Sequence, residues 1–277
     1  MLYQRILVVQ DISCVGQCSL TVALPILSAC GLETAILPSA VLSTHTGGDF
    51  KGYTFRDLTD DIPAICAHWQ KQGISFDALY TGYLGSARQV EMVEHIMKTL
   101  VKGGGAKIVD PAMADNGKLY AGFDATYVDA MRRLCRAADV ILPNVTEAAL
   151  LTGLPYREHY DEAYVRSLLD GLADLGVRHV VLTGVSYAPD TLGVLVCENG
   201  KTTYRPHRRI DRMFHGTGDV YASAFTGARM SGRTLVDAAA IAADFTLACI
   251  ENTVDAPEHW YGVRFEPVLP KLIEMLK

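Results

Sequence analysis

Short β-rich runs alternate with amphipathic segments along almost the whole chain, and this alternation constrains the fold more than any other feature. Strand-like runs are predicted at residues 6–10, 34–37, 78–81, 107–110, 140–142 and 179–183. The segments between them place apolar residues at the spacing of one buried helix face, as residues 90–100 do. Strands that alternate with helices build βαβ units around a mainly parallel sheet. The sequence therefore predicts an α/β fold.

No repeat, low-complexity tract or linker interrupts this alternation, so we expect one domain over residues 1–277. A helix over residues 19–30 contains Pro25, which should kink it. Asn199 and Gly200 predict a hairpin turn between strands at residues 191–197 and 202–204. Helices are predicted again from residue 220 and over residues 234–251.

Helix-capping residues predict where two other helices begin. Asp61 precedes a proline, which suits an acidic cap with proline in the first helical turn. Ser86 and Gln89 have the spacing of a capping box. A further helix is predicted over residues 161–175, where leucines recur on one face.

The charge balance argues against a nucleic-acid partner. The formal net charge is -6, with 25 basic and 31 acidic residues, whereas nucleic-acid binding favours a clustered basic excess. The densest basic group is short and is predicted to be a solvated loop; its members are Arg205, His207, Arg208, Arg209 and Arg212.

Neither a membrane segment nor a disulfide framework is expected. No apolar run approaches the roughly 18 residues that span a bilayer, and the N-terminus enters a strand-like run without a signal peptide. The seven cysteines include no Cys-x-x-Cys pair, so we expect buried, reduced thiols in a cytoplasmic protein.

The sharpest motif is Gly216-Thr217-Gly218-Asp219, directly before a helix-like run. Two glycines at this spacing let backbone N–H groups converge, and a helix N-terminus adds its positive dipole end, so the motif predicts an anion cradle. An aspartate in the first helical turn would lie beside a bound phosphoryl group and could accept a proton from an attacking hydroxyl. Taken alone, the motif is equally a glycine turn with an acidic helix start.

A second polar group follows two of the predicted strands. Asn144 and Glu147 come after the strand at residues 140–142, and Asp110 and Asp115 come after the strand at residues 107–110. Side chains at such junctions meet at the edge of the sheet where α/β proteins bind ligands, and their oxygens suit hydrated Mg²⁺. By itself, the Asn144 and Glu147 pair also fits an ordinary helix cap. The chain has no Walker A sequence and no Gly-x-Gly-x-x-Gly after its first strand.

Together these motifs resemble the ribokinase superfamily and, within it, the pyridoxal kinases, along nearly the whole chain. Met213 and Phe214 stand where the broad superfamily has Asp-Thr before its final Gly-x-Gly-Asp, as in the pyridoxal kinase version. The resemblance implies a three-layer α/β/α sandwich with a mainly parallel central sheet. It also implies ATP as phosphoryl donor, Mg²⁺, a homodimer, and K⁺ as a second cation to be tested.

The resemblance assigns roles to the residues of these motifs. Asp219 would be the catalytic base, and Gly216, Thr217 and Gly218 would cradle the transferring phosphoryl. Metal-site positions fall on Asn144, Glu147 and Asp115. Positions that would contact ATP are Asp110, Asp115, Tyr120, Asn144, Thr183 and Gly184.

Three further segments resemble the acceptor site of pyridoxal kinases. His45 and Thr46 match a Ser-Asn-His-Thr segment whose Thr would contact ring substituents, and Tyr83 matches a Thr-Gly-Tyr whose ring covers the substrate. Asp11 stands where many members have Ser facing the pyridine nitrogen, and a carboxylate there would favour a protonated ring nitrogen or an amino group. Each residue also has a plain structural interpretation, as a loop hydrogen-bonder (His45), a packing residue (Tyr83) or a helix-side cap (Asp11).

The sequence therefore predicts an ATP-dependent kinase of pyridoxal, pyridoxine or pyridoxamine that acts on the 5′-hydroxymethyl group. Hydroxymethylpyrimidine kinase activity is the nearest alternative, because Asp11 also suits a pyrimidine. A sugar kinase fits less well, since the Asp-Thr of the final motif is missing. A non-catalytic sensor of vitamin or nucleotide is the alternative of another class, and the presence of Asp219 argues against it.

Overall fold

The computed structural model describes residues 3–210, 212 and 214–277. Its centre is a nine-stranded sheet with the order β11-β10-β9-β8-β5-β4-β1-β2-β3. The strands are β1 (Arg5–Ser13), β2 (Glu33–Leu42), β3 (Phe55–Asp57), β4 (Phe76–Thr81), β5 (Val101–Val109), β8 (Val140–Ile141), β9 (His179–Val185), β10 (Thr191–Glu198) and β11 (Lys201–Arg208). The central strands β2, β1, β4, β5, β8 and β9 run parallel to their neighbours among this set. At the two edges, β3 pairs antiparallel with β2, and β10 pairs antiparallel with β9 and β11. The mainly parallel sheet is thus confirmed.

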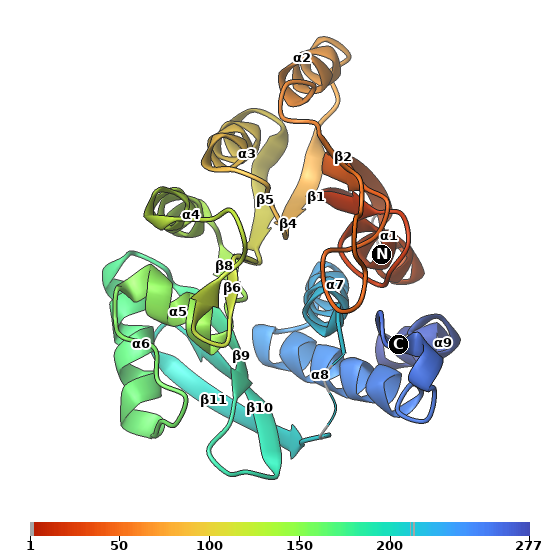
Figure 1. The fold of residues 1–277 in the computed structure, drawn as a ribbon. Coiled ribbons are helices and arrows are strands. Elements are labelled where there is room, and N and C mark those ends of the chain that lie inside the picture. The colour runs from red at the N-terminus through yellow and green to blue at the C-terminus, as the bar shows by residue number, and fades with distance from the viewer. Residues whose placement is uncertain (1–2, 211, 213) are drawn as a thin grey trace.

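Helices cover both faces of this sheet (Figure 1). They are α1 (Leu20–Ala29), α2 (Ile62–Lys71), α3 (Ala87–Thr99), α4 (Ala125–Ala137), α5 (Val145–Thr152), α6 (Glu162–Asp174), α7 (Thr217–Met230), α8 (Leu235–Glu251) and α9 (Leu269–Met275), with 3-10 turns at Pro257–His259 and Glu266–Val268. The fold is a three-layer α/β/α sandwich, as predicted.

Alternating side chains of the central strand divide the core between the two faces. Leu7 and Val9 pack with the buried residues of α2 to α6, whereas Ile6 and Val8 pack with those of α1, α7, α8 and α9. This period of two follows from the strand geometry, because successive side chains point to opposite faces. All four side chains are fully buried.

Several local predictions hold, because short-range chemistry fixes them. Asn199 and Gly200 turn the β10–β11 hairpin with φ angles of 50° and 81°, the left-handed conformation that such turns require. Ser86 accepts a hydrogen bond from the Gln89 amide, but Gln89 does not complete the capping box. Its Oε1 instead accepts from the Gly85 amide at 2.7 Å, and its Nε2 donates to the Ser39 carbonyl.

Other local predictions were wrong. Asp61 precedes α2 without a side-chain cap bond. Pro25 does lie inside α1, and the kink expected there stays a prediction. Arg205 and Arg208, from the basic group, lie on β11 rather than on a loop, because their backbone pairs with β10. Their side chains form ion pairs with Asp244 and Glu251 of α8. Asp11 lies within β1 and not after it. All seven cysteines are free and four are buried, whereas Cys14 is exposed.

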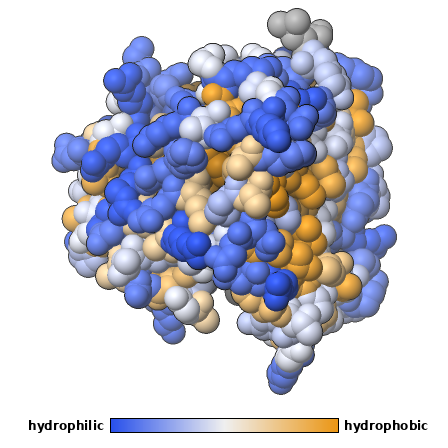
Figure 2. All heavy atoms as spheres, turned by 90° about the horizontal axis from the view of Figure 1, so that it is seen from above, coloured by the Kyte–Doolittle hydropathy of each residue, from blue (hydrophilic) through white to orange (hydrophobic). Residues whose placement is uncertain are grey.

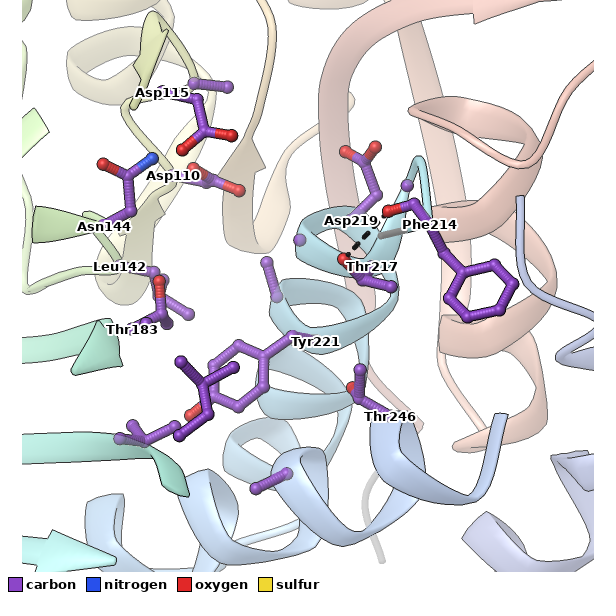
Figure 3. A pocket seen from close by; sticks show the side chains of 18 of the residues that line it. Asp110, Asp115, Leu142, Asn144, Thr183, Phe214, Thr217, Asp219, Tyr221 and Thr246 are labelled. Carbon is purple, nitrogen blue, oxygen red and sulfur yellow. Dashed lines mark hydrogen bonds between the residues drawn. The ribbon is translucent and has the colours of Figure 1, made fainter. Parts of the chain in front are cut away.

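The surface in Figure 2 is mostly hydrophilic, with apolar side chains gathered in a smaller part of this face. No helix of the described chain is long and apolar enough to cross a membrane. The carboxyl ends of β1, β4, β5, β8 and β9 meet at one edge of the sheet, which is where doubly wound folds bind ligands. The N-terminus of α7 lies at that same edge (Figure 3).

Candidate active site

A cavity of about 420 Å³ lies at this edge of the sheet, between the strand ends and the N-terminus of α7 (Figure 3). Sequence positions from 110 to 219 meet around it. The predicted residues that line it are Asp110, Asp115, Tyr120, Asn144, Glu147, Thr183, Gly184, Gly216, Thr217, Gly218 and Asp219. The fold thus brings together every residue predicted to contact nucleotide, metal or phosphoryl group.

The glycine motif forms the start of α7. Gly216 is the N-cap residue with φ 74°, a left-handed conformation that strains any residue with a Cβ. A Cβ on Gly216 would lie 1.6 Å from the Gln17 carbonyl oxygen, so glycine also permits the close approach of the loop after β1. A Cβ on Gly218 would meet nothing within 4 Å. Gly218 therefore borders open space, and the first amides of a helix have no partner within the helix, as an anion cradle requires.

Asp219 lies in the first turn of α7, beside this cradle. Burial raises its pKa to about 7, with a further contribution from the charge of Asp11, while the nearby Ser19 amide lowers it. A carboxyl group with this pKa is substantially ionised at neutral pH and still basic enough to take a proton from a hydroxyl group. Its position and its pKa both suit a general base.

Asn144 and Glu147 cap α5 reciprocally. The Glu147 amide donates to Asn144 Oδ1 at 2.9 Å, and the Asn144 amide donates to Glu147 Oε2 at 2.8 Å. Glu147 Oε1 accepts from the Met113 amide at 3.0 Å, and Asn144 Nδ2 donates to the Ala114 carbonyl at 2.8 Å. The pair therefore fixes the chain after β5, and the remaining lone pairs of Glu147, with one lone pair and one N–H of the Asn144 amide, are left for another ligand.

Acidic side chains crowd the nucleotide side of the site and hold their protons more tightly than usual. Burial raises the pKa of Glu147 to about 8, although three backbone amides lower it. Burial also raises the pKa of Asp110 well above its usual value, with further contributions from Glu147 and Asp219. Among residues 3–210, 212 and 214–277, no three His, Cys, Asp or Glu side chains form a ready metal cage. This arrangement fits Mg²⁺, which binds through one or two carboxylates together with water and phosphate oxygens.

Asp11 and Tyr83 lie outside the lining of the cavity. The β1–β2 ladder shifts register between Gln10 and Ile12, so Asp11 sits at a break in the pairing. Asp11 is buried, and its Oδ2 accepts a hydrogen bond from Ser13 Oγ at 3.0 Å. Burial raises the pKa of Tyr83 to about 12, and the charge of Asp11 adds to the shift.

Comparison with known proteins decides the family. The family model described as phosphomethylpyrimidine kinase matches residues 53–263, more than half of the chain. The chain belongs to this family. A pyridoxine/pyridoxal/pyridoxamine kinase of Bordetella pertussis is 30% identical over 261 residues, which cover 87% of this chain and 86% of that protein.

Two solved structures resemble this family member over almost its whole length. The pyridoxal kinase from Lactobacillus plantarum superposes with a TM-score of 0.90 at 34% identity, covering 98% of this chain and 97% of that one. A Bacteroides thetaiotaomicron protein, provisionally described as a phosphomethylpyrimidine kinase and crystallised with pyridoxal, gives a TM-score of 0.91 at 37% identity, with coverages of 98% and 96%. The predicted ribokinase-like fold and the predicted class, an ATP-dependent phosphotransferase, are confirmed.

Two of the residues predicted to contact the acceptor differ in exposure. His45 is buried, its Nε2 lies 2.8 Å from the Tyr261 carbonyl, and its Nδ1 accepts from the Gly47 amide at 3.1 Å. Both ring nitrogens of His45 are thus occupied within the protein, which gives this residue a role in shaping the loop after β2. Thr46, the next residue, is exposed.

One part of the family member's cavity had no counterpart in the sequence motifs. Leu192, Gly193 and Val194 of β10 face apolar residues of α8, and together they form an apolar slot. The α8 residues that line it are Ala243, Thr246, Leu247 and Ile250. Thr246 Oγ1 is buried without a hydrogen-bond partner there. No sequence signal marked this slot, because apolar residues on a helix and a strand look like ordinary packing.

Proposed function

We propose that this family member transfers the γ-phosphoryl group of ATP to the 5′-hydroxymethyl group of pyridoxal, pyridoxine or pyridoxamine. The observation that carries the proposal is the position of Asp219. It lines the 420 Å³ cavity at the N-terminus of α7, and the charge of Asp11, a residue predicted to contact the acceptor, acts on its carboxyl group. A base in this position reaches both a nucleotide phosphate and the hydroxyl group of a small ring compound.

The nucleotide would occupy the cavity, with its base in the apolar slot between β10 and α8. Its phosphates would lie toward the strand ends at Asn144 and Thr183 and toward the amides of Gly216 to Gly218. These amides and the α7 dipole stabilise negative charge on the transferring group. Tyr120, which lines the cavity from the loop after β7 (Lys118–Leu119), would cover the nucleotide.

Transfer then needs little covalent chemistry from the protein. The hydroxymethyl oxygen attacks the γ-phosphorus while Asp219 takes the hydroxyl proton. A bond forms from that oxygen to phosphorus, the bond from phosphorus to the β–γ bridging oxygen breaks, and ADP leaves. The products are the 5′-phosphate, ADP and the proton held by Asp219.

Asp110 and Asp115 would hold Mg²⁺ together with nucleotide phosphates, and Glu147 would act through a bound water. The cap bonds of Asn144 and Glu147 favour this division, because they occupy one lone pair and one N–H of the Asn144 amide and one lone pair of each Glu147 oxygen. When bound, the cation neutralises phosphate charge. A K⁺ requirement is part of the same proposal, and activity with K⁺ in place of Na⁺ tests it.

The acceptor ring would lie between Asp11 and Tyr83. A buried carboxylate pairs best with a ring nitrogen that carries a proton, since the hydrogen bond is then charge-assisted. Tyr83 would cover the ring face, and Thr46, exposed at the loop after β2, would contact its substituents.

Hydroxymethylpyrimidine is the second candidate acceptor, and the match to the phosphomethylpyrimidine kinase family favours it. The two rings differ at the position that Asp11 would face: the pyridine offers its protonated ring nitrogen, whereas hydroxymethylpyrimidine offers an amino group. The bound pyridoxal of the Bacteroides thetaiotaomicron protein supports the pyridine.

A panel of acceptors tests the proposal. ADP formation is measured with pyridoxal, pyridoxine, pyridoxamine and hydroxymethylpyrimidine, at saturating MgATP and with an acceptor-free control. We expect acceptor-dependent turnover with at least one vitamin B6 compound, at a higher kcat/KM than with the pyrimidine. Turnover with the pyrimidine alone would support the second candidate.

We also propose that the protein forms a homodimer. All three residues of its edge strand β3 are exposed, and Phe55 of this strand and Tyr53 just before it present 49% and 42% of their surface to solvent. Light scattering coupled to size-exclusion chromatography tests this proposal: a mass near 30.1 kDa would contradict it.

A further inference from the structure

A compact segment joins the nucleotide side of the site to the acceptor side. It begins with a hairpin in which β6 (Ala114–Asp115) pairs with β7. Two backbone hydrogen bonds then close the segment. The Tyr120 amide donates to the Met113 carbonyl at 2.9 Å, and the Phe123 amide donates to the Tyr120 carbonyl at 3.2 Å. Tyr120 faces the cavity, whereas Phe123, three residues later, faces Tyr83.

Phe123 is the middle ring of a three-ring stack. Its centroid lies 3.8 Å from that of Tyr127 at an interplanar angle of 8°, and 5.5 Å from that of Tyr83 at 27°. Phe123 and Tyr83 are half-buried, and Tyr127 is buried. Stacked aromatic pairs have a preferred geometry and an attraction beyond that of buried area. The position of the Tyr83 ring therefore depends on that of Phe123.

Tyr127 gives this stack a fixed base. Its hydroxyl group donates to the Leu84 carbonyl at 2.8 Å, and its amide donates to Asp124 Oδ1, the N-cap side chain of α4, at 3.1 Å. The base of the stack is thus held both to α4 and to the residue that follows Tyr83. Phe123 is the one ring of the three that belongs to the segment carrying Tyr120.

We propose that Phe123 is a positioning residue that couples nucleotide binding to acceptor binding. The 114–123 segment already holds Phe123 on Tyr127, and a nucleotide in contact with Tyr120 would fix the segment in this position, so that the seated ring holds Tyr83 over the acceptor. By reciprocity, an acceptor that orders Tyr83 favours the closed segment and tightens nucleotide binding by the same factor. The inference rests on the proposed function, because it uses the contacts of Tyr83 with the acceptor and of Tyr120 with the nucleotide.

Binding measured with each ligand in the absence and presence of the other tests the coupling. The dissociation constant of pyridoxal is determined calorimetrically with and without saturating Mg²⁺ and a β,γ-imido analogue of ATP. The analogue is then titrated with and without pyridoxal. We expect the wild-type protein to show coupling of about 2- to 10-fold, the range that one aromatic stack supports. Phe123→Ala should bring this factor close to one, and Phe123→Tyr should retain it.

The ratio of each ligand's dissociation constants, measured without and with the other ligand, separates coupling from a merely structural role of Phe123. If Phe123→Ala only lowered fold stability, both ligands would bind more weakly, but each dissociation constant would still change when the other ligand is added. Phe123→Leu supplies a second variant that keeps an apolar side chain. A coupling factor unchanged in Phe123→Ala, or absent in a wild-type protein that binds both ligands, would overturn the inference. A wild-type protein that binds the analogue but no pyridoxal would instead contradict the proposed function, and the inference with it.

Discussion

The side chains of Asn144 and Glu147 each accept a hydrogen bond from the other residue's backbone amide across the first turn of α5, at 2.9 and 2.8 Å. The same Glu147 carboxylate accepts from Met113, which belongs to the segment that follows β5. One acidic side chain therefore caps a helix, positions the loop that carries Asp115, and contributes a carboxyl group to the nucleotide side of the site. The cap and the metal-site interpretations of this pair are compatible, because Glu147 can reach a cation through water.

Glu147→Gln should raise the Mg²⁺ concentration needed for half-maximal activity. A neutral amide attracts the cation less, and its NH₂ group leaves a backbone donor that faced the carboxylate without an acceptor, which costs about 1–3 kcal/mol of stability. Initial rates against Mg²⁺ at saturating acceptor measure the effect, and thermal unfolding follows stability. Asp161→Ala is the matched control, since Asp161 caps α6 away from the cavity. It should lower stability by about 1 kcal/mol without changing the Mg²⁺ requirement. Equal Mg²⁺ dependence in both variants would limit Glu147 to a structural role.

The pH profile of kcat/KM should report Asp219. Because burial and Asp11 raise its pKa to about 7, the base is protonated and inactive at lower pH. We expect kcat/KM to rise with pH and to reach half its plateau near pH 7. Asp11→Ser removes a charge that raises this pKa, so the midpoint should move to lower pH. A profile that stays flat between about pH 5.5 and 8.5 would be incompatible with Asp219 as the base.

Two alanine substitutions in the glycine motif should separate folding from phosphate binding. Gly216→Ala places a Cβ against the Gln17 carbonyl at a left-handed φ, so it should lower the melting temperature clearly. The conformational cost alone is about 1–2 kcal/mol. Gly218→Ala has open space around its Cβ and should change stability by only about 0.5 kcal/mol. Its methyl group would, however, enter the cradle and raise KM for ATP. An unchanged KM in Gly218→Ala would place the phosphates elsewhere.

Local signals in the sequence predicted much of the fold and the phosphate side of the site. The cradle before α7 and the strand-end residues Asp110 and Asn144 depend on short motifs, and the sheet order collects them at one edge. The apolar slot could not be predicted, since Val194 and Leu247 meet only after β10 and α8 pack together. The partners of His45 are likewise remote, because one of them is Tyr261.

Asp11 shows a different limit of the sequence. Its side chain was expected just beyond the first strand, but that strand runs on to Ser13 through a shift in register with β2. A register shift depends on both strands of a pair, so one strand read alone does not show it.

Asp11→Ser should therefore reveal which ring the site recognises. If the acceptor is a protonated pyridine, the variant should keep turnover of pyridoxal but bind it more weakly, since a charge-assisted bond is replaced by a neutral one. If Asp11 binds a pyrimidine amino group, hydroxymethylpyrimidine turnover should fall far more than pyridoxal turnover. The measurement is kcat/KM for both acceptors in both proteins. Negligible and equal changes would show that Asp11 touches neither ring.

The central claim is that Asp219 activates a hydroxymethyl group for attack on ATP. Turnover of pyridoxal by wild type and Asp219→Asn tests it most directly, with product identified as the 5′-phosphate by ³¹P NMR and ATP binding measured separately. We expect Asp219→Asn to bind ATP normally while kcat falls on the order of 10²–10⁴-fold, because an amide cannot accept the proton. A variant within a few-fold of wild-type kcat would contradict it and would reduce Asp219 to a helix-capping residue.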